Sequence, residues 1–191
     1  VPDWYIGSCK KIKYLFPKAH AVAYVMMAFR IAWFKVYHPL AFYSAYFYRR
    51  SQKGGFDAVL MTQGKESIMA NMDAIENNEN ASDKDEDLLT TMEVVYEYYL
   101  RGFTFAPIDI YKSHATKFLT EDGKILPPFV AISGLGENAA WDLMRGREGK
   151  TFLSIEEVAA ACPKVSKTHI QMLKDAGAFG SLPDTSQISL F

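Results

Sequence analysis

Apolar and polar positions along this chain alternate mostly with helical spacing, and the strongest such stretch covers residues 18 to 37. The apolar positions that follow the helical repeat are Tyr24, Met27, Ile31 and Phe34. Alanine, valine and methionine fill most other faces, and a helix that is apolar nearly all round is typical of one buried on most sides. Arg30 and Lys35 interrupt the run, whereas a membrane span needs about 20 consecutive apolar residues. The pattern therefore predicts a buried core helix that ends at Pro39.

Shorter helices are predicted on either side of a glycine break. Residues 40 to 48 form an aromatic-rich helical stretch that closes on Arg49 and Arg50, and Gly54-Gly55 follows as the break. A polar helix is expected from residue 57 to about residue 80.

The next stretch is strongly acidic and is interpreted as a solvated turn. Residues 73 to 87 carry seven acids against Lys84, a sum of −6 that leaves +5 for the rest of a chain with a formal net charge of −1. The basic clusters are Lys10 to Lys13, Arg145 to Lys150 and Lys164 to Lys174. One acidic face and several basic ones fit a protein that touches DNA on one side only.

The middle of the chain predicts one more helix and a β-hairpin. Residues 88 to 100 form the helix, and Gly102 is its expected end. Strand patterns at residues 115 to 119 and 124 to 126 flank Asp122-Gly123, which is typical of a tight hairpin turn. The fold class is therefore mainly α, with a small β-hairpin.

A pair of glycines marks residues 129 to 140 as a candidate binding element. The segment reads Phe-Val-Ala-Ile-Ser-Gly-Leu-Gly-Glu-Asn-Ala-Ala, which predicts an apolar helix, a glycine turn and the start of a second helix. Glycines let the chain reverse tightly and expose N–H groups where the helix dipole favours an anion, so a DNA phosphate is the natural ligand. The pattern resembles a helix-hairpin-helix motif, and an ordinary helix end and turn is the alternative. The candidate DNA-binding residues are Ser133, Gly134, Leu135, Gly136, Asn138, Arg145, Arg147, Lys150 and Lys167.

A second helical pair follows the glycine turn. Ser154 and Glu157 form a capping-box pattern, and Ser166 is expected to begin a helix that ends at Gly177. This pair is either a second hairpin unit or packing for the first.

Composition indicates a globular chain without a disulfide framework or a zinc site. Apolar residues make up 49% and charged residues 23%, and Cys9 and Cys162 lie far apart with no CxxC spacing. The histidines His20, His38, His114 and His169 also lack metal-ligand spacing. A reducing cytosol is the expected location. The start at Val1, without an initiator methionine or a leader, is interpreted as an excision point inside a longer polypeptide.

The region before and inside the long helix carries a resemblance to a known family. Lys18 and His20 fall in the first helical turn, beside free backbone donors, where they suit a polyphosphate; a capped helix with surface side chains is the simpler explanation of the spacing alone. The run from Trp4 through His20 to His38-Pro39 resembles the end of the fingers domain of C-family replicative DNA polymerases, most closely the PolC type.

The resemblance implies a role in nucleotide binding but not in catalysis. The residues it assigns to the incoming-nucleotide pocket are Ser8, Tyr14, Lys18 and His20. The family's chemistry is two-metal phosphoryl transfer, whose Mg²⁺-binding carboxylates would lie upstream of this chain. Asp83 and Asp85 imitate such a pair but stand in a polar run without a strand, so no catalytic or metal-binding residue and no cofactor is assigned here.

The last residues resemble the clamp-binding pentapeptide of bacterial polymerases. They are Gln187, Ile188, Ser189, Leu190 and Phe191. A short tail with a glutamine and two large apolar side chains suits a preformed cleft on a partner.

Together these features predict three regions of one replicative polymerase. Residues 1 to 107 would be the end of the fingers, residues 108 to 182 a duplex-binding helix-hairpin-helix domain, and residues 183 to 191 the clamp-binding tail. The expected partners are primer–template DNA, an incoming deoxynucleoside triphosphate, the sliding clamp (the β subunit) and the rest of the polymerase chain, which also carries an exonuclease. No membrane partner is expected, and the chain alone should catalyse no nucleotidyl transfer.

Two other functions fit parts of the sequence. One is an independent helix-hairpin-helix DNA-binding or repair accessory protein with a clamp tail, which would not need the segment around Lys18 and His20. The other is a helical interaction module of the replisome that never touches DNA. Duplex binding that weakens steeply with salt would exclude this second function.

Overall fold

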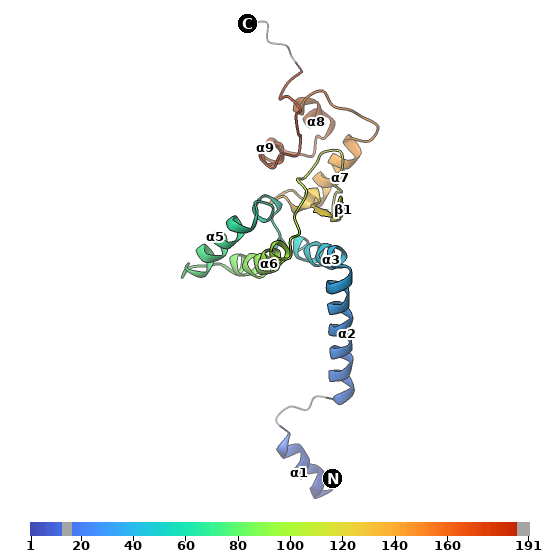
Figure 1. The fold of residues 1–191 in the computed structure, drawn as a ribbon, viewed down its shortest axis with the longest axis vertical. Coiled ribbons are helices and arrows are strands. Elements are labelled where there is room, and N and C mark those ends of the chain that lie inside the picture. Colours follow the sequence, from blue (N-terminus) through green and yellow to red (C-terminus); the bar gives the residue numbers. More distant parts are fainter. Residues whose placement is uncertain (13–16, 187–191) are drawn as a thin grey trace. The chain divides into compact units, whose positions relative to one another are not determined.

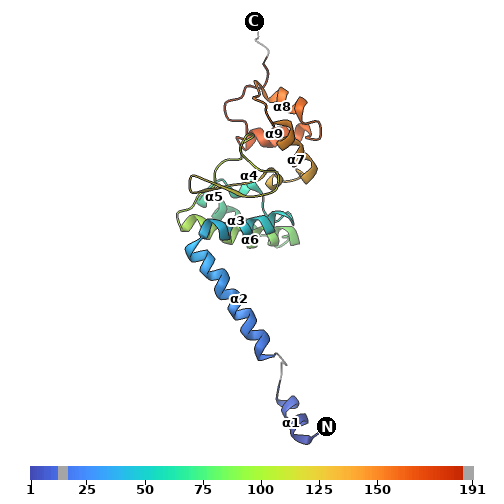
Figure 2. The ribbon, with the colours of Figure 1, turned by 90° about the vertical axis from the view of Figure 1, so that its right-hand side faces the viewer.

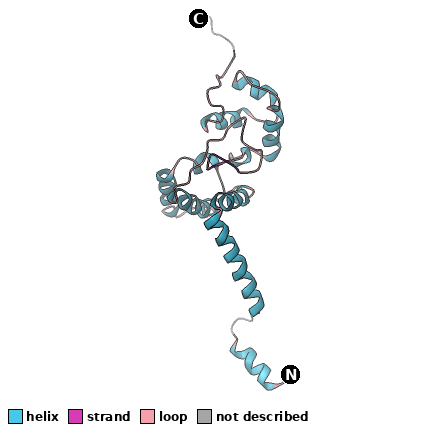
Figure 3. Ribbon diagram, turned by 45° about the vertical axis from the view of Figure 1, so that its right-hand side comes forward, coloured by secondary structure: helices cyan, strands magenta, loops and turns pink. Residues whose placement is uncertain are grey.

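The computed structural model describes residues 1–12 and 17–186, and the chain divides into two compact units, Val1–Phe42 and Tyr43–Phe191. Figure 1 shows the elements: α1 Asp3–Lys11, α2 Lys18–Tyr37, α3 Pro39–Ser51, α4 Ala58–Met61, α5 Lys65–Glu76, α6 Asp83–Leu100, β1 Leu119–Glu121, β2 Lys124–Leu126, the 3-10 turn η1 Phe129–Ala131, α7 Glu137–Gly146, α8 Ile155–Ala161 and α9 Lys167–Asp175. The predicted mainly α fold with a small hairpin is confirmed (Figure 3).

The N-terminal unit contains α1 and α2. The predicted bounds of the long helix are confirmed, since α2 runs from Lys18 to Tyr37 and Pro39 already opens α3. The predicted burial is wrong: no residue of α2 is buried, and Phe29 is 73% exposed. A helix that is apolar all round needs neighbours on several sides, and α1, the other helix of this unit, has no buried residue either. By length and composition alone α2 could cross a membrane, a test that core helices of soluble proteins also pass.

The second unit is built on α3 and α6, which lie side by side in two perpendicular views (Figures 1 and 2). Tyr43 and Phe47 of α3 are fully buried, as is Tyr98 of α6, and the Tyr43 and Tyr98 rings meet edge to face with centroids 5.0 Å apart. Phe56 and Phe105 extend this aromatic cluster, with ring centroids 5.1 Å from Phe47 and 4.8 Å from Tyr98 respectively. Edge-to-face and tilted pairs at these distances add to the free energy gained by burying the rings.

The acidic stretch is helical where a solvated turn was predicted. Residues 83 to 87 form the first turn of α6, whose N-cap Ser82 shares a capping box with Asp85. Hydrogen bonds from the Ser82 N–H and hydroxyl groups lower the pKa of the Asp85 carboxyl. Asp87 pairs with Arg50 of α3 at 3.0 Å. Acids at a helix N-terminus are stabilised by the helix dipole, which is why this segment can fold.

The polar helix predicted from residue 57 to about residue 80 is interrupted. Asp57 caps the single turn of α4 by accepting hydrogen bonds from the N–H groups of Val59 and Leu60. Gly64, with φ 100°, then precedes α5. A positive φ of this size is not helical, and glycine adopts it without a Cβ clash. The backbone therefore leaves the helical conformation at Gly64, and a new helix starts after it.

The predicted β-hairpin is confirmed, with a shorter first strand. β1 and β2 pair antiparallel, with Leu119 opposite Leu126, and Asp122 and Gly123 both have positive φ, 48° and 76°. Two such residues define the type of turn that matches the strand twist. The residues before Leu119 turn instead of extending, because the His114 Nδ1 accepts the backbone N–H groups of Thr116 and Lys117.

The last part of the chain holds η1, α7, α8 and α9. The apolar segment before the glycine turn is a single 3-10 turn and not the helix that was predicted there. α7 packs on α8 where Gly146 faces Cys162: a Cβ at Gly146 would lie 2.4 Å from the Cys162 Sγ. α8 in turn contacts α9. The second helical pair therefore packs against α7.

Candidate nucleic-acid interface

The glycine turn between η1 and α7 forms a closed hairpin. The Leu135 N–H donates to the Ile132 carbonyl at 3.0 Å, and Gly134 between them has φ 79°. Leu135 is only 2% exposed, so its side chain anchors the turn in the core. Gly136, in extended conformation, is the N-cap of α7. We call residues 132 to 136 the hairpin turn. Of the predicted DNA-binding residues, Leu135 can therefore offer only main-chain groups to a ligand.

The hairpin turn leaves several backbone donors without a partner. The N–H groups of Gly134, Gly136, Glu137 and Asn138 donate no hydrogen bond to any group in residues 1–12 and 17–186, and all four residues are exposed. Three of these groups belong to the N-cap and first two residues of α7, where the helix dipole is positive. Several free N–H groups at one helix N-terminus are a ready site for an anion such as a phosphate.

The predicted basic residues lie at the far end of α7. Arg145 is exposed in the last turn, and Lys150 is exposed after it. With a rise of about 1.5 Å per residue, Arg145 lies roughly 12 Å along the helix from the first turn of α7. The hairpin turn and these cations would therefore meet different phosphates of one backbone.

Arg147 has a structural partner. Its Nη1 donates to the Ile110 carbonyl at 2.6 Å, and its guanidinium lies 5.5 Å from the Phe129 ring centroid. Burial lowers the pKa of this guanidinium. Arg147 thus joins the loop before the β-hairpin to η1, and part of its hydrogen-bonding capacity is already used.

The second helical pair brings further polar groups to the same region. Ser166 caps α9 by accepting from the His169 N–H, and Lys167, the first residue of α9, is exposed. The Lys174 Nζ contacts Asp184 at 2.6 Å, while Ile155 N–H donates to the Pro183 carbonyl. Residues 183 and 184 are thereby held on α8 and α9.

Sequence reasoning missed one cation beside the hairpin turn. The lining of a cleft of about 320 Å³ includes Ile132 to Gly136, Asp57, and Lys84 and Leu88 of α6. Lys84 is exposed at the start of α6. Because Lys84 stands in the most acidic stretch of the chain, the negative net charge of that stretch gave no reason to select it as a DNA-binding residue. Lys84 adds a positive charge to the lining of this cleft, and the carboxylate of Asp57 adds a negative one.

The candidates for the nucleotide pocket belong to the N-terminal unit. Ser8 is exposed on α1, and Lys18 and His20 are exposed in the first turn of α2, where the His20 ring lies 4.5 Å from the Tyr24 ring centroid. Tyr14 lies outside the described residues, as do Gln187, Ile188, Ser189, Leu190 and Phe191. The roles of all these residues stay predictions.

The residues that the structure describes offer no group of three or more His, Cys, Asp or Glu side chains that could hold a metal ion. Asp85 is engaged with Ser82 in the capping box.

Comparison with known families agrees with this geometry. Residues 102–188 match the family model described as a helix-hairpin-helix motif. The match contains the hairpin turn, α7, α8 and α9. The predicted helix-hairpin-helix segment is therefore confirmed.

The whole chain is similar to one particular polymerase. It is 48% identical to the DNA polymerase III PolC-type of Streptococcus suis, 48% to that of Thermotoga petrophila and 50% to that of Caldanaerobacter subterraneus subsp. tengcongensis, in each case over 100% of this chain. The chain spans 13% to 14% of the length of these relatives. It is thus related along its whole length to one segment of PolC-type DNA polymerase III, as the resemblance predicted.

Proposed function

We propose that this chain is the part of a DNA-directed DNA polymerase that holds the primer–template duplex. Its hairpin turn would bind a backbone phosphate through the free N–H groups of Gly134, Gly136, Glu137 and Asn138. The observation that carries this proposal is that these free donors fall inside the segment that matches the helix-hairpin-helix model.

Binding of this kind is independent of base sequence. Main-chain N–H groups recognise phosphate oxygens and carry no information about the bases, so they fix the position of a duplex without reading it. Arg145 and Lys150 would meet further phosphates along the same backbone, and Lys167 would do so from α9. A polymerase that must copy any sequence needs contacts of this type.

Two further roles rest on the sequence resemblance. Ser8, Tyr14, Lys18 and His20 would contact the incoming deoxynucleoside triphosphate, and the exposure of Lys18 and His20 is compatible with such a ligand. Gln187 to Phe191 would bind the sliding clamp. Both roles belong to the whole polymerase, and so does the Mg²⁺-dependent transfer step, for which this chain supplies no carboxylate cluster among its described residues. Such an enzyme would work in the cytoplasm.

Salt-dependent duplex binding tests the proposal. The 191-residue chain should bind a fluorescently labelled duplex, with an affinity that is equal for unrelated sequences and falls steeply as salt rises. Each phosphate neutralised by a lysine or arginine contributes a slope of about −0.9 to log K against log salt. A slope near zero, or no binding at low salt, would leave an interaction module that does not touch DNA as the better account.

A further inference from the structure

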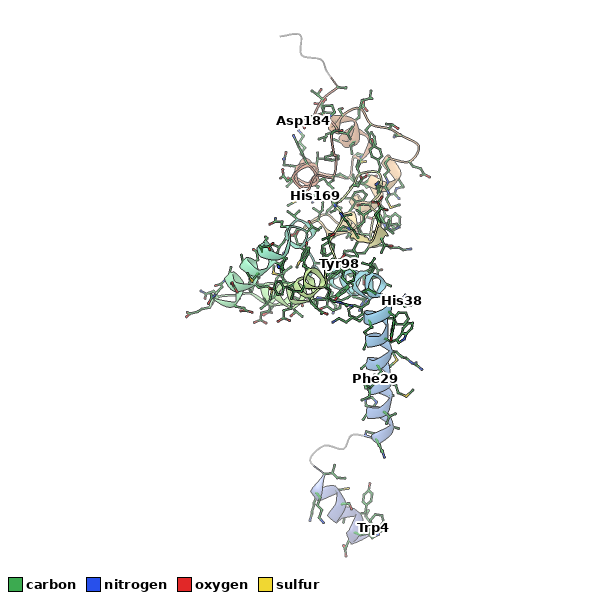
Figure 4. The ribbon with its side chains drawn as sticks, viewed as in Figure 1. Trp4, Phe29, His38, Tyr98, His169 and Asp184 are labelled. Atoms are coloured by element: carbon green, nitrogen blue, oxygen red, sulfur yellow. The ribbon has the colours of Figure 1, made fainter. Side chains whose placement is uncertain are left out.

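A histidine from the last helix lies against the hairpin turn. The His169 Nε2 is 3.7 Å from the position that a Cβ on Gly134 would occupy. Gly134 has φ 79°, so the hairpin turn already requires glycine for conformational reasons. The imidazole occupies the side of the turn that this missing side chain leaves open. Two segments far apart in the sequence thereby meet at the proposed phosphate site (Figure 4, which labels His169 on α9).

The ring of His169 is held in a defined orientation. Its Nδ1 lies 2.9 Å from the Ser166 Oγ, and that oxygen also accepts the His169 backbone N–H at 3.2 Å. Ser166 is the N-cap of α9, so the hydroxyl that begins the helix also fixes the ring. A neutral imidazole has one N–H donor and one acceptor nitrogen. If the Ser166 hydroxyl donates its proton to Nδ1, the ring proton is on Nε2. The imidazolium form likewise carries a proton on Nε2.

The Nε2 atom has no partner of its own among residues 1–12 and 17–186, and the side chain is half-buried. It is therefore an oriented polar atom beside Gly134, a residue of the hairpin turn whose own N–H group is free among the described residues. The contact with Ser166 stabilises the start of α9, and it also leaves Nε2 facing the hairpin turn at Gly134.

We propose that His169 is a further DNA ligand, which donates its Nε2–H to the backbone phosphate held by the hairpin turn. This inference rests on the proposed function and adds to it a side-chain donor from α9. The second helical pair then serves two purposes, because it packs on α7 and completes the phosphate site.

Two substitutions separate the ligand role from packing. In His169→Gln the side-chain amide NH₂ falls near the position of Nε2, so a donor toward the hairpin turn is retained. In His169→Asn the amide falls near Nδ1, so the contact with Ser166 is retained but the donor toward the hairpin turn is lost. Gln171→Ala is the matched control, because Gln171 is exposed on the same helix and its side chain, among the described residues, bonds Asp175 alone.

The measurement is fluorescence anisotropy of a labelled duplex with the full 191-residue chain. His169→Asn and His169→Ala should weaken binding by roughly tenfold, the effect of one hydrogen bond to a charged group. His169→Gln and Gln171→Ala should stay within about twofold of the unsubstituted chain. Urea unfolding of each variant reports whether the fold is retained.

The outcomes distinguish this inference from the function on which it rests. If the unsubstituted chain binds the duplex and the Gln, Asn and Ala variants all bind it with the same affinity as the unsubstituted chain, the role of His169 is overturned and the proposed function stands. Equal weakening in all three variants, with a matching loss of stability, assigns His169 to packing and also overturns it. Absence of duplex binding by the unsubstituted chain overturns both.

Discussion

The two long helices α2 and α6 show that apolar composition and burial are separate properties. α2 is the more apolar helix, yet none of its 20 residues is buried. α6 begins with a run of acids, yet Thr91, Met92, Val95 and Tyr98 along one face are buried. The spacing of these residues explains the difference, because a single apolar stripe can be covered by one neighbouring layer. α6 finds that layer in α3 and α5, whereas α2 is apolar on all sides.

The two units differ in how far their large apolar side chains are buried. The second unit, which contains the segment that matches the helix-hairpin-helix model, has its own aromatic core. The N-terminal unit exposes large apolar side chains along α2, and exposed apolar surface of this extent is typical of sites that contact protein or membrane.

The largest expected difference is between two phenylalanines. Phe47 on α3 is fully buried, whereas Phe29 on α2 is 73% exposed. Phe47→Ala should lower the free energy of unfolding by about 3–5 kcal/mol, because it leaves a cavity in the aromatic cluster. Phe29→Ala should change it by less than about 0.5 kcal/mol. Urea unfolding followed by tyrosine and tryptophan fluorescence measures both free energies. Equal losses of stability would contradict the difference in burial between α3 and α2.

The two cysteines should differ in thiol reactivity, because one is buried in the second unit and the other is exposed in the N-terminal unit. Burial raises the pKa of the Cys162 thiol to about 11, whereas Cys9 is exposed on α1. The thiolate is the reactive form, so at pH 8 Cys162 should react with a disulfide reagent on the order of 100-fold more slowly than Cys9. One fast and one slow equivalent in native protein, and two fast ones in urea, are expected. Two fast equivalents in native protein would mean that α7 and α8 do not pack as described.

Two helical glycines differ in the same way. A Cβ at Gly146 would lie 2.4 Å from the Cys162 Sγ and 3.0 Å from the Ala161 carbonyl oxygen, whereas one at Gly7 meets nothing within 4 Å. Gly146→Ala should destabilise the second unit by about 1–3 kcal/mol, as overpacking does. Gly7→Ala should leave that unit unchanged. Thermal unfolding of both variants checks this, and a neutral Gly146→Ala would show that the contact between α7 and α8 can relax.

The smallest effect is expected from two neighbouring arginines. Arg50 donates to the Thr91 hydroxyl at 2.7 Å and to the Asp87 carboxylate at 3.0 Å, whereas the exposed Arg49 donates to the Gln52 side chain at 3.2 Å. Arg50→Ala should cost about 1–2 kcal/mol, because buried Thr91 loses a partner. Arg49→Ala should cost less than about 0.5 kcal/mol. Denaturant midpoints of the two variants, compared in the same buffer, test whether the acidic start of α6 is held to α3.

Local patterns of the sequence predicted local structure well. The turn at Asp122-Gly123 and the bounds of α2 followed from backbone chemistry that a few neighbouring residues decide. The helix was predicted to begin at residue 88, whereas α6 begins at Asp83. Ser82 and Asp85 form a capping box, but the surrounding negative charge suggested a solvated turn. The clearest error concerned the burial of α2, which depends on what surrounds a helix.

The candidate site was predictable only in part. The glycine pair located the hairpin turn, because it reflects a local backbone requirement. The neighbours Lys84 and His169 come from segments on either side of it in the sequence, and only the fold brings them to the hairpin turn. Long-range contacts of this kind have no signal in residue spacing. The assignments of Ser8, Tyr14, Lys18, His20 and the clamp-binding tail stay predictions.

The central claim is that backbone N–H groups of the hairpin turn and of the first turn of α7 bind DNA phosphate, and one substitution can remove a single such group. Glu137 is the first residue of α7, a position that favours proline, and Gly136 before it is extended with ψ 160°, as a residue preceding proline should be. Glu137→Pro therefore deletes one N–H donor without straining the helix. Glu137→Ala is its control, since it loses the same carboxylate but keeps the N–H.

Duplex affinity of these two variants is the most direct measurement. The account predicts that Glu137→Pro binds about tenfold more weakly than Glu137→Ala at the same salt, with equal stability, because one hydrogen bond to a charged phosphate is lost. Equal affinity of the two variants would contradict the account, since the duplex would then be held without the N–H group of Glu137.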